Sequence, residues 1–340
     1  MESSAATPRE ADTLPQPMAP PVAPTWDHQS KRERRLARGY HDVSDVRTRL
    51  HDLRRTNLVL TTAAAVVDLA CFVGIGVTVG FVWRWLPWET AATVSFAATV
   101  LMARPLRALE NLVHEASHYN WSRTKWLNDA AATFLAAFPV LLTVGSYRNS
   151  HLRHHNEFGT ANDPDLRRFM TLDMDGLDRS SPWRLAVGMV RRLPRYETGW
   201  IRSLARSRGA LAGVVWYGVL LVVMRYLGVP IQILWVALIG MLWAMLVTLP
   251  VLRLIGESEE HLYSEGTIFA ATVSNVGLLH RWYVHPHGDA YHLEHHLHET
   301  VPWFNVRRLS KLLVKSDKGN FGGRRRFRTR LAQYPKRGEK

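Results

Sequence analysis

Long apolar stretches, grouped in two closely spaced pairs, dominate the sequence. Residues 58–83 are apolar apart from Asp68, and residues 231–252 contain no charged side chain. Each of these stretches is long enough to cross the hydrocarbon core of a membrane as a helix of about 20 residues. A shorter apolar stretch follows the first, and another precedes the last across the tight turn from Gly228 to Pro230. The pattern predicts four membrane-spanning helices in two hairpins, at about 58–83, 90–110, 209–228 and 231–252.

The segments around these helices are polar or too short to cross. Residues 1–30 are rich in Pro, Ala, Ser and Thr, which predicts a disordered tail without a secretory signal. Charged residues are frequent in 31–57 and recur at helical spacing. This pattern predicts a basic amphipathic helix on the membrane surface, and a solvated helix is the alternative. The apolar residues 130–145 predict a re-entrant or interfacial segment. We expect residues 58–310 to form one membrane domain and residues 311–340 a loosely ordered basic tail.

The chain is strongly basic, with a formal net charge of +14. The placement of this charge argues against nucleic-acid binding. Of the 43 Lys and Arg residues, all but Arg84 and Arg225 lie away from the hairpin tips, in the N-terminal, central and C-terminal segments. The positive-inside rule places these segments in the cytoplasm, and Trp83, Trp85 and Trp88 at the first tip fit an aromatic belt on the opposite side. The sequence therefore predicts a multi-pass membrane protein with both termini in the cytoplasm.

Histidine is concentrated in one HxxxH and two HxxHH clusters. Positions i, i+3 and i+4 lie on one face of a helix, so each cluster presents its imidazoles together. Imidazole binds iron, copper, zinc and nickel, and an excess over the three or four ligands of a zinc site favours a multinuclear metal centre. The candidate ligands, including the outlier His261, are His114, His118, His151, His154, His155, His261, His292, His295 and His296. The remaining histidines, expected on the surface or in loops, are His28, His41, His51, His280, His285, His287 and His298.

The predicted topology allows the three clusters to meet. An even number of spans separates the second cluster from the third, and the segment 130–145 between the first and second does not cross, so all three lie on the cytosolic side. We expect the second span to continue, kinked, beyond Pro105 and to carry the first cluster into the cytosol. The fourth span should likewise extend to His261. Glu257 and His261 would then stand at i, i+4 on one helix face, both directed inward.

Acidic residues near the clusters are candidates for orienting the imidazoles. A metal-bound imidazole usually donates its second N–H to a carboxylate or carbonyl group. The candidates are Asp163, Asp165, Glu257, Glu115 and Glu294. The two aspartates are favoured because they stand in the loop directly after the second cluster. For Glu115 and Glu294, a solvated or salt-bridged surface position is an equal alternative.

The order and spacing of these clusters, together with the two hairpins, resemble the integral-membrane fatty acid desaturase and hydroxylase superfamily. The resemblance covers about residues 58–309 and includes the segment from Tyr291 to Leu297, Val301-Pro302 and the Glu260-His261 pair. It implies two iron ions held on the cytosolic side, O2 as co-substrate and electrons from a separate ferredoxin, rubredoxin or cytochrome b5 type of donor with its reductase. The chain departs from the family at Leu297-His298-Glu299 and in the three-residue spacer of its first cluster.

We therefore predict an all-α integral membrane oxygenase of four spans, with a cytosolic helical cap that carries the histidines. The resemblance implies that it introduces a C=C bond into a fatty acyl or lipid chain. The alternative within the superfamily is a hydroxylase or ketolase of a lipid, carotenoid or other apolar metabolite. A histidine-rich metal transporter is an alternative from another class, but transporters place their ligands near the bilayer midplane. Here the histidines are expected beyond the helix ends.

Overall fold

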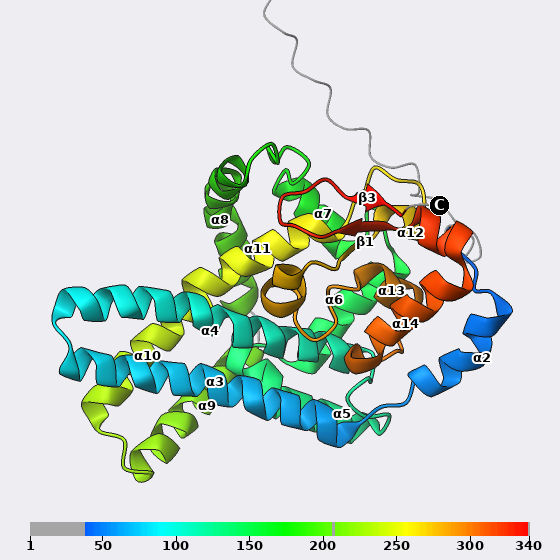
Figure 1. The fold of residues 1–340 in the computed structure, drawn as a ribbon. Helices are drawn as coiled ribbons and strands as arrows, with labels where there is room; N and C mark the ends of the chain where they lie inside the picture. The colour runs from blue at the N-terminus through cyan, green and yellow to red at the C-terminus, as the bar shows by residue number, and fades with distance from the viewer. Residues whose placement is uncertain (1–37, 206–207, 339–340) are drawn as a thin grey trace, which may run out of the picture.

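The computed structural model describes residues 38–205 and 208–338. The predicted tail 1–30 with His28, and residues 31–37 of the predicted surface helix, lie outside the described residues. Long apolar helices project to one side of the molecule, and shorter elements gather at the other (Figure 1). We call α3, α9, α10 and the N-terminal half of α4 the apolar arm, and the remaining elements the polar head.

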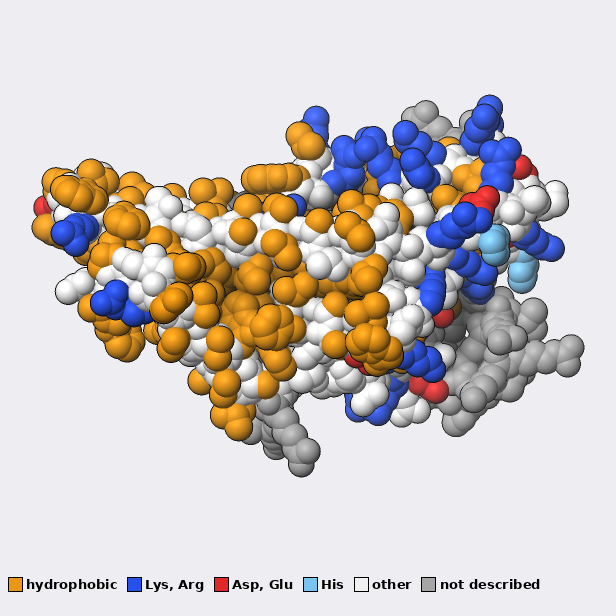
Figure 2. Space-filling view, turned by 90° about the horizontal axis from the view of Figure 1, so that it is seen from below, with side chains coloured by type: hydrophobic (Ala, Val, Ile, Leu, Met, Phe, Trp, Pro, Cys, Tyr) orange, Lys and Arg blue, Asp and Glu red, His pale blue; other side chains and the backbone are white. Residues whose placement is uncertain are grey.

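The apolar arm is built from two helical hairpins. Helices α3 (Leu58–Trp85) and α4 (Trp88–Ser117) run antiparallel across a two-residue connection, and the Asn57 side chain caps α3 by accepting a hydrogen bond from the Leu60 amide. Helices α9 (Arg208–Tyr226) and α10 (Ile231–Trp243) meet at a turn where Gly228 has a φ of +91°, a conformation that glycine adopts without strain. Apolar side chains cover the face of the arm seen in Figure 2. Such a surface fits contact with lipid.

The predicted count of membrane spans is supported in part. Three described helices are long and apolar enough to cross a membrane: Leu58–Trp85, Gly209–Tyr226 and Ile231–Glu260. A bent pair, Lys125–Val140 with Val144–Asn156, would make a fourth if it were one broken span. Helix α4, predicted as the second span, is not among the three, because Glu89, Arg104 and the polar residues of its C-terminal half reduce its apolar character.

The segment predicted as re-entrant is a bent pair of helices. Helix α5 (Lys125–Ala132) continues through the π-helix η1 (Thr133–Ala137) and the 3-10 helix η2 (Phe138–Val140), and α6 (Val144–Asn156) then leaves at an angle of 89°. Leu141, with a φ of 59°, forms the bend. The Thr143 and Ser146 side chains cap the start of α6 reciprocally, which fixes where this helix begins.

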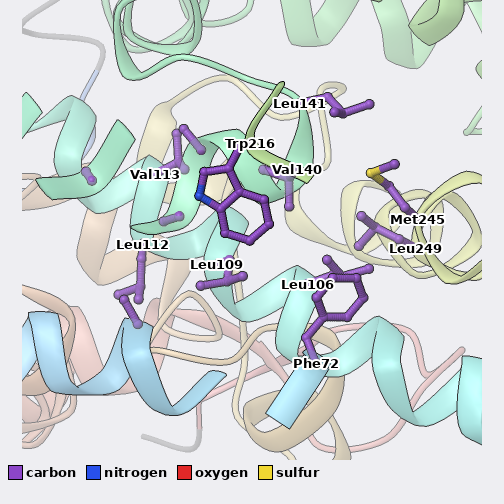
Figure 3. Packing of buried hydrophobic residues seen from close by; sticks show 14 of the residues in the cluster. Phe72, Leu106, Leu109, Leu112, Val113, Val140, Leu141, Trp216, Met245 and Leu249 are labelled. Atoms are coloured by element: carbon purple, nitrogen blue, oxygen red, sulfur yellow. The ribbon is translucent and has the colours of Figure 1, made fainter. Parts of the chain in front are cut away.

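The hydrophobic core lies where the arm joins the polar head. Helix α10 continues through the π-helix η3 (Ala244–Thr248) into α11 (Leu249–Glu260), so one long segment runs from the arm into the head. Trp216 of α9 packs among Leu109 and Val113 of α4 and Val140 of η2 (Figure 3). This packing fixes the C-terminal half of α4, which carries the first histidine cluster, against the bent segment that precedes the second.

The polar head consists of shorter elements wrapped around the end of α4. The predicted helix at 31–57 is limited, within the described residues, to α2 (Ser44–Leu53), which packs on α14. The other helices of the head are α7 (Pro164–Thr171), α8 (Pro182–Ala205), α12 (Ile268–Ala271), η4 (His280–Val284), α13 (His292–Leu297), α14 (Trp303–Ser316) and η5 (Lys318–Gly322).

The described part of the chain is mostly helical, as the sequence predicts, and a small sheet adds to the polar head. Strand β1 (Val273–Asn275) pairs in parallel with β2 (Arg326–Arg328), which pairs antiparallel with β3 (Lys336–Arg337). Residues 311–338, expected as a loosely ordered tail, therefore fold against the head. Arg328 is buried and donates hydrogen bonds to the carbonyl oxygens of Glu259 and Gln333. Basic composition alone predicted a solvated tail and missed this buried arginine.

Candidate metal centre

Four elements bring the histidine clusters together in the polar head. His114 lies in the last turn of α4 and His118 directly follows that helix. The second cluster lies on α6 and the third on the short helix α13. His261 follows the end of α11 in an extended conformation and pairs with Thr272 in a β-bridge. The structure therefore places all the predicted ligands, from segments far apart in the sequence, in one region.

Five imidazoles form the first group, which we call the five-histidine group. Its members are His114, His118, His151, His155 and His295, and their ligand atoms all lie within 4.8 Å of one another. The Nε2 atoms face inward: His114 and His295 are 2.9 Å apart, His118 and His151 are 2.9 Å apart, and His155 and His151 are 3.0 Å apart.

The other four imidazoles form the four-histidine group. His154, His261 and His296 have ligand atoms within 4.8 Å of one another. The Nε2 atom of His292 lies 3.2 Å from the Nε2 atoms of both His261 and His296. The two groups adjoin, because the rings of His155 and His296 stack with their centroids 4.4 Å apart. Each of the two adjacent groups contains histidines placed closely enough to hold a metal ion.

Hydrogen bonding among the rings cannot account for all of these short contacts. The Nδ1 atoms of His114 and His155 lie 3.3 Å from Asp289 and 3.1 Å from Glu299, so each ring carries its proton there and leaves a lone pair on Nε2. Both of these Nε2 atoms approach Nε2 of His295, at 2.9 and 3.3 Å, and His295 can donate to only one of them. Separations near 3 Å are those of nitrogens bound about 2.1 Å from a shared cation. The donor set therefore fits metal ions, and imidazole suits iron.

The electrostatic environment favours the neutral form of most of these imidazoles; His154 is the exception, because the effect of burial is outweighed by Asp165 and Asp163, which raise its pKa. Burial lowers the pKa values of His118, His261, His292, His295 and His296 well below their ordinary range, and the neighbouring histidines lower them further. A neutral imidazole has a free lone pair and is the form that binds a metal.

Carboxylate groups contact the Nδ1 atoms of several imidazole rings, on the side away from the inward-facing Nε2 atoms. Asp163 is fully buried, lies 2.9 Å from Nδ1 of His154 and also accepts the amide hydrogen bonds that cap α7. Asp289 contacts Nδ1 of His114 and, at 2.9 Å, Nδ1 of His285. Such partners fix the tautomer and orientation of an imidazole.

The comparison with known protein families agrees with this geometry. The family model described as fatty acid desaturase matches residues 88–319, which include all nine histidines. The chain belongs to the fatty acid desaturase family. No curated protein matches the chain. Membership in this desaturase and hydroxylase superfamily, together with the apolar helices, makes the protein a membrane-associated oxidoreductase with a lipid substrate.

Only some of the acids that were predicted to orient the imidazole rings of this desaturase-family protein contact those rings. Asp163 contacts His154 directly, and Asp165 lies 3.7 Å from the same Nδ1 atom. Glu257 instead accepts hydrogen bonds from Arg168 and Tyr196, each at 3.1 Å. The prediction that Glu257 and His261 share a helix face is wrong, because α11 ends at Glu260 and the backbone of His261 is extended.

Glu115 and Glu294 are also directed away from the nitrogens. Glu115 accepts the Trp303 amide hydrogen bond at 2.8 Å, and burial raises its pKa to about 8. Glu294 accepts hydrogen bonds from the hydroxyl groups of Ser274 and Ser310. A residue next to a ligand in a helix is turned about 100° from it, so neither acid can share the ligand face. Their predicted surface alternative is wrong as well, since both are buried.

Three acids near the imidazoles were not among the candidates predicted from the sequence: Asp289, Glu299 and Glu260. Glu260 lies 4.0 Å from Nε2 of His292. A signal existed for Asp289, which precedes His292 by three residues, and for Glu299, which follows His296 by three residues.

The seven remaining histidines were predicted on the surface or in loops; His28 lies outside the described residues, His285, His287 and His298 lie in loops, and His280 lies in η4. His41 and His51 are exposed. His280, His285 and His298 are buried and pair with Glu259, Asp289 and Asp42, at 2.8, 2.9 and 3.0 Å respectively. His287 is partly buried and pairs with Asp68 of α3 at 2.6 Å. These pairs join the third-cluster segment to the rest of the head and arm.

A cavity of about 630 Å³ opens beside the histidines. It lies between α4, α6, α7, α8 and α11, and its wall includes His114 and His151 from the five-histidine group and His154, His261 and His292 from the four-histidine group. A molecule in this cavity would contact the faces of both groups, so we regard it as the candidate substrate site.

Proposed function

We propose that the protein is a diiron oxidoreductase that introduces a C=C bond into a lipid or fatty acyl chain. The observation that carries the proposal is the convergence of inward-facing Nε2 atoms into two adjacent groups. Two iron ions bound there would supply the activation of O2 and the abstraction of hydrogen from an unactivated C–H bond. The proposed ligands are His114, His118, His151, His155 and His295 for one ion, and His154, His261, His292 and His296 for the other.

The carboxylates around the rings prepare these ligands. Asp163, Asp289 and Glu299 keep the protons of their partner imidazoles on Nδ1, and Nε2 is then available to a cation. Because the rings are buried and packed against one another, their positions are set before any metal arrives. A preformed site of this kind favours a fixed geometry between the metal pair and the substrate.

The reaction requires electrons as well as O2. Removal of two hydrogens from adjacent carbons, with two further electrons and two protons, converts one O2 into two waters and leaves an alkene. We propose that the electrons come from a separate ferredoxin, rubredoxin or cytochrome b5 type of protein with its reductase. The basic segments suggest that the polar head and both termini face the cytoplasm, where such donors are found.

Iron content and lipid products together test this function. We expect about two iron ions per purified chain, and lipids lacking two hydrogens only in a host that expresses the protein. His154→Ala should abolish this product, whereas His51→Ala, at an exposed position, should not. Iron far below two per chain in active protein, or zinc in active protein that iron does not improve, would contradict the diiron assignment. If the products have gained oxygen, the reaction is hydroxylation or ketone formation instead of desaturation. Small differences in substrate placement decide between these outcomes.

A further inference from the structure

One part of the cavity wall, next to His154, carries a cluster of charged and hydroxyl side chains. Arg168 of α7 pairs with Glu257 of α11 at 3.1 Å and with Asp165, and the Tyr196 hydroxyl also donates to Glu257 at 3.1 Å. All four side chains line the cavity. Asp165 in turn lies 3.7 Å from Nδ1 of His154. This polar cluster is therefore separated from the proposed metal ions by a single imidazole ring.

Carboxylates outnumber guanidinium groups around the cavity, and the guanidinium groups already have partners. Arg253 pairs with Glu110, and Arg107 lies 3.5 Å from Glu110, 3.6 Å from Glu260 and 3.3 Å from Asp289. The lining contains the five acids Glu110, Asp165, Glu257, Glu260 and Asp289 and the three arginines Arg107, Arg168 and Arg253. Because the guanidinium groups are already paired with these carboxylates, an added hydrogen-bond donor finds acceptor oxygens here, whereas an added anion would have to displace a carboxylate from an arginine.

A bare methylene chain fits this wall poorly. Covering these ion pairs with hydrocarbon removes their remaining water and is unfavourable unless new polar contacts replace it. Apolar side chains line the cavity on both sides of this cluster. Phe169 and Tyr263 lie on the side of His261, and Leu142, Trp200 and Leu204 lie beside Gly209, at the start of the apolar helix α9. An apolar tail can therefore leave the charged cluster along the second of these sides, toward the arm.

We propose that the cavity binds the head group of an amphipathic lipid, with a hydrogen-bond-donating hydroxyl or ammonium group directed to Glu257 and the tail directed toward α9. The carbon that reaches the histidines is then within a few bonds of the head group, rather than in the middle of an acyl chain. The position of oxidation rests on the proposed function of the histidine groups, whereas head-group binding does not.

Binding of three matched probes tests the proposal. Iron-loaded protein in detergent micelles is titrated with hexadecylamine, hexadecanol and hexadecanoate, and binding to empty micelles is subtracted. We expect the amine or the alcohol to bind at least about tenfold more tightly than hexadecanoate. Glu257→Gln should weaken binding of the preferred probe about tenfold, as expected for a lost hydrogen bond to a charged group. If Glu257→Gln weakens the binding of hexadecylamine alone, the head group is an ammonium group. If it weakens the binding of both hexadecylamine and hexadecanol, the contact is of the hydroxyl type.

Two further variants keep this test specific. Tyr196→Phe retains the Glu257 carboxylate and should retain the preference, and Glu89→Gln makes the same chemical change at the exposed far end of α4 and should alter nothing. Unchanged iron content in Glu257→Gln shows that the variant has folded. Equal or tighter binding of hexadecanoate, or no effect of Glu257→Gln on any probe, would overturn the proposal.

The position of oxidation separates this proposal from the proposed function. Mass spectrometry of lipid products locates the new functional group along the chain. Oxidation near the head group supports both proposals. Oxidation in the middle of an acyl chain overturns the head-group assignment and leaves the diiron function standing. Selective binding of the amine or alcohol without iron or oxidation overturns the function and leaves the head-group site standing.

Discussion

Oδ1 of Asp163 lies 2.9 Å from Nδ1 of His154 and also accepts the amide hydrogen bonds of Asp165 and Leu166 at the start of α7. One buried carboxylate thus both orients a proposed ligand and begins the helix that carries Asp165 and Arg168 to the cavity. Asp163 therefore positions both a histidine of the proposed metal site and a helix of the cavity wall.

The first prediction concerns Asp163→Asn. Asparagine is as good a helix cap as aspartate, so α7 should survive. The neutral amide cannot stabilise the imidazole as a carboxylate does, and the loss of such a partner typically costs 10- to 100-fold in metal affinity or activity. We expect iron content and turnover to fall within about that range, measured by elemental analysis and lipid profiling. Asp165→Asn, at 3.7 Å from the ring, is the control and should have a smaller effect. Equal effects of the two substitutions would contradict the assigned role.

The second prediction separates His261 from Glu257. His261→Ala should remove iron and activity as strongly as a substitution in α6 or α13, because His261 lies 3.2 Å from His292 in the four-histidine group. Glu257→Gln should keep its iron, since Glu257 contacts Arg168 and Tyr196 instead of an imidazole. Elemental analysis of both purified variants decides the matter. Full iron content in His261→Ala would limit that group to three histidines.

These two residues also show where sequence reasoning ends. Cluster spacing identified eight of the histidines that meet, because it follows from helix periodicity, and His261 was added as an outlier expected at the end of the fourth span. The partners of the histidines depend on how separate segments pack, as in the pairing of His155 with Glu299. The end of α11 at Glu260 depends on the β-bridge between His261 and Thr272. Such long-range contacts produce no periodic pattern in the sequence. Glu257 was therefore predicted to act with His261, whereas it contacts Arg168 and Tyr196. The fold of residues 311–338 was missed for the same reason.

The third prediction concerns pH and metal removal. Burial lowers the pKa values of His118, His261, His292, His295 and His296 in the folded protein below the ordinary 6.5. The unfolded chain therefore binds more protons below pH 6.5, and the free energy of unfolding of metal-free protein should fall as the pH drops through that range. Iron should oppose this loss, because it binds only the folded, deprotonated ligands. Thermal denaturation between pH 5 and 8, with and without chelator, measures both effects. A pH-independent Tm of the metal-free protein would contradict the prediction.

The fourth prediction concerns an ion pair in the apolar arm. Asp68 of α3 is buried and pairs with Arg104 of α4 and with His287. Asp68→Leu leaves Arg104 without its partner in an apolar setting, which typically costs about 3–5 kcal/mol. Adding Arg104→Leu should recover much of the loss, because no uncompensated charge remains. Thermal denaturation in detergent compares these variants with Val67→Leu, at an exposed position of the same helix. No decrease in the Tm of Asp68→Leu would show that this pair contributes little to stability.

The fifth prediction concerns orientation in the membrane. In a background lacking Cys71, a cysteine at exposed Asn149 should react with an impermeant reagent only from the cytosolic side. A cysteine at Leu227, which is 69% exposed at the tip of the α9–α10 hairpin, should react only from the opposite side. Labelling of intact and permeabilised cells distinguishes the two. The reverse pattern would contradict the predicted cytosolic position of the histidines.

The parallel pairing of β1 with β2 has a consequence for biosynthesis. A nascent chain leaves the ribosome N-terminus first, so His114 and His118 exist long before His295, with which they share a group. Strand β1 precedes the third cluster and is completed only by residues 326–328, close to the end of the chain. The apolar helices therefore leave the ribosome before the histidine groups can be completed. A chain terminated before β1 still contains its apolar helices, but it lacks the third-cluster histidines that complete both groups.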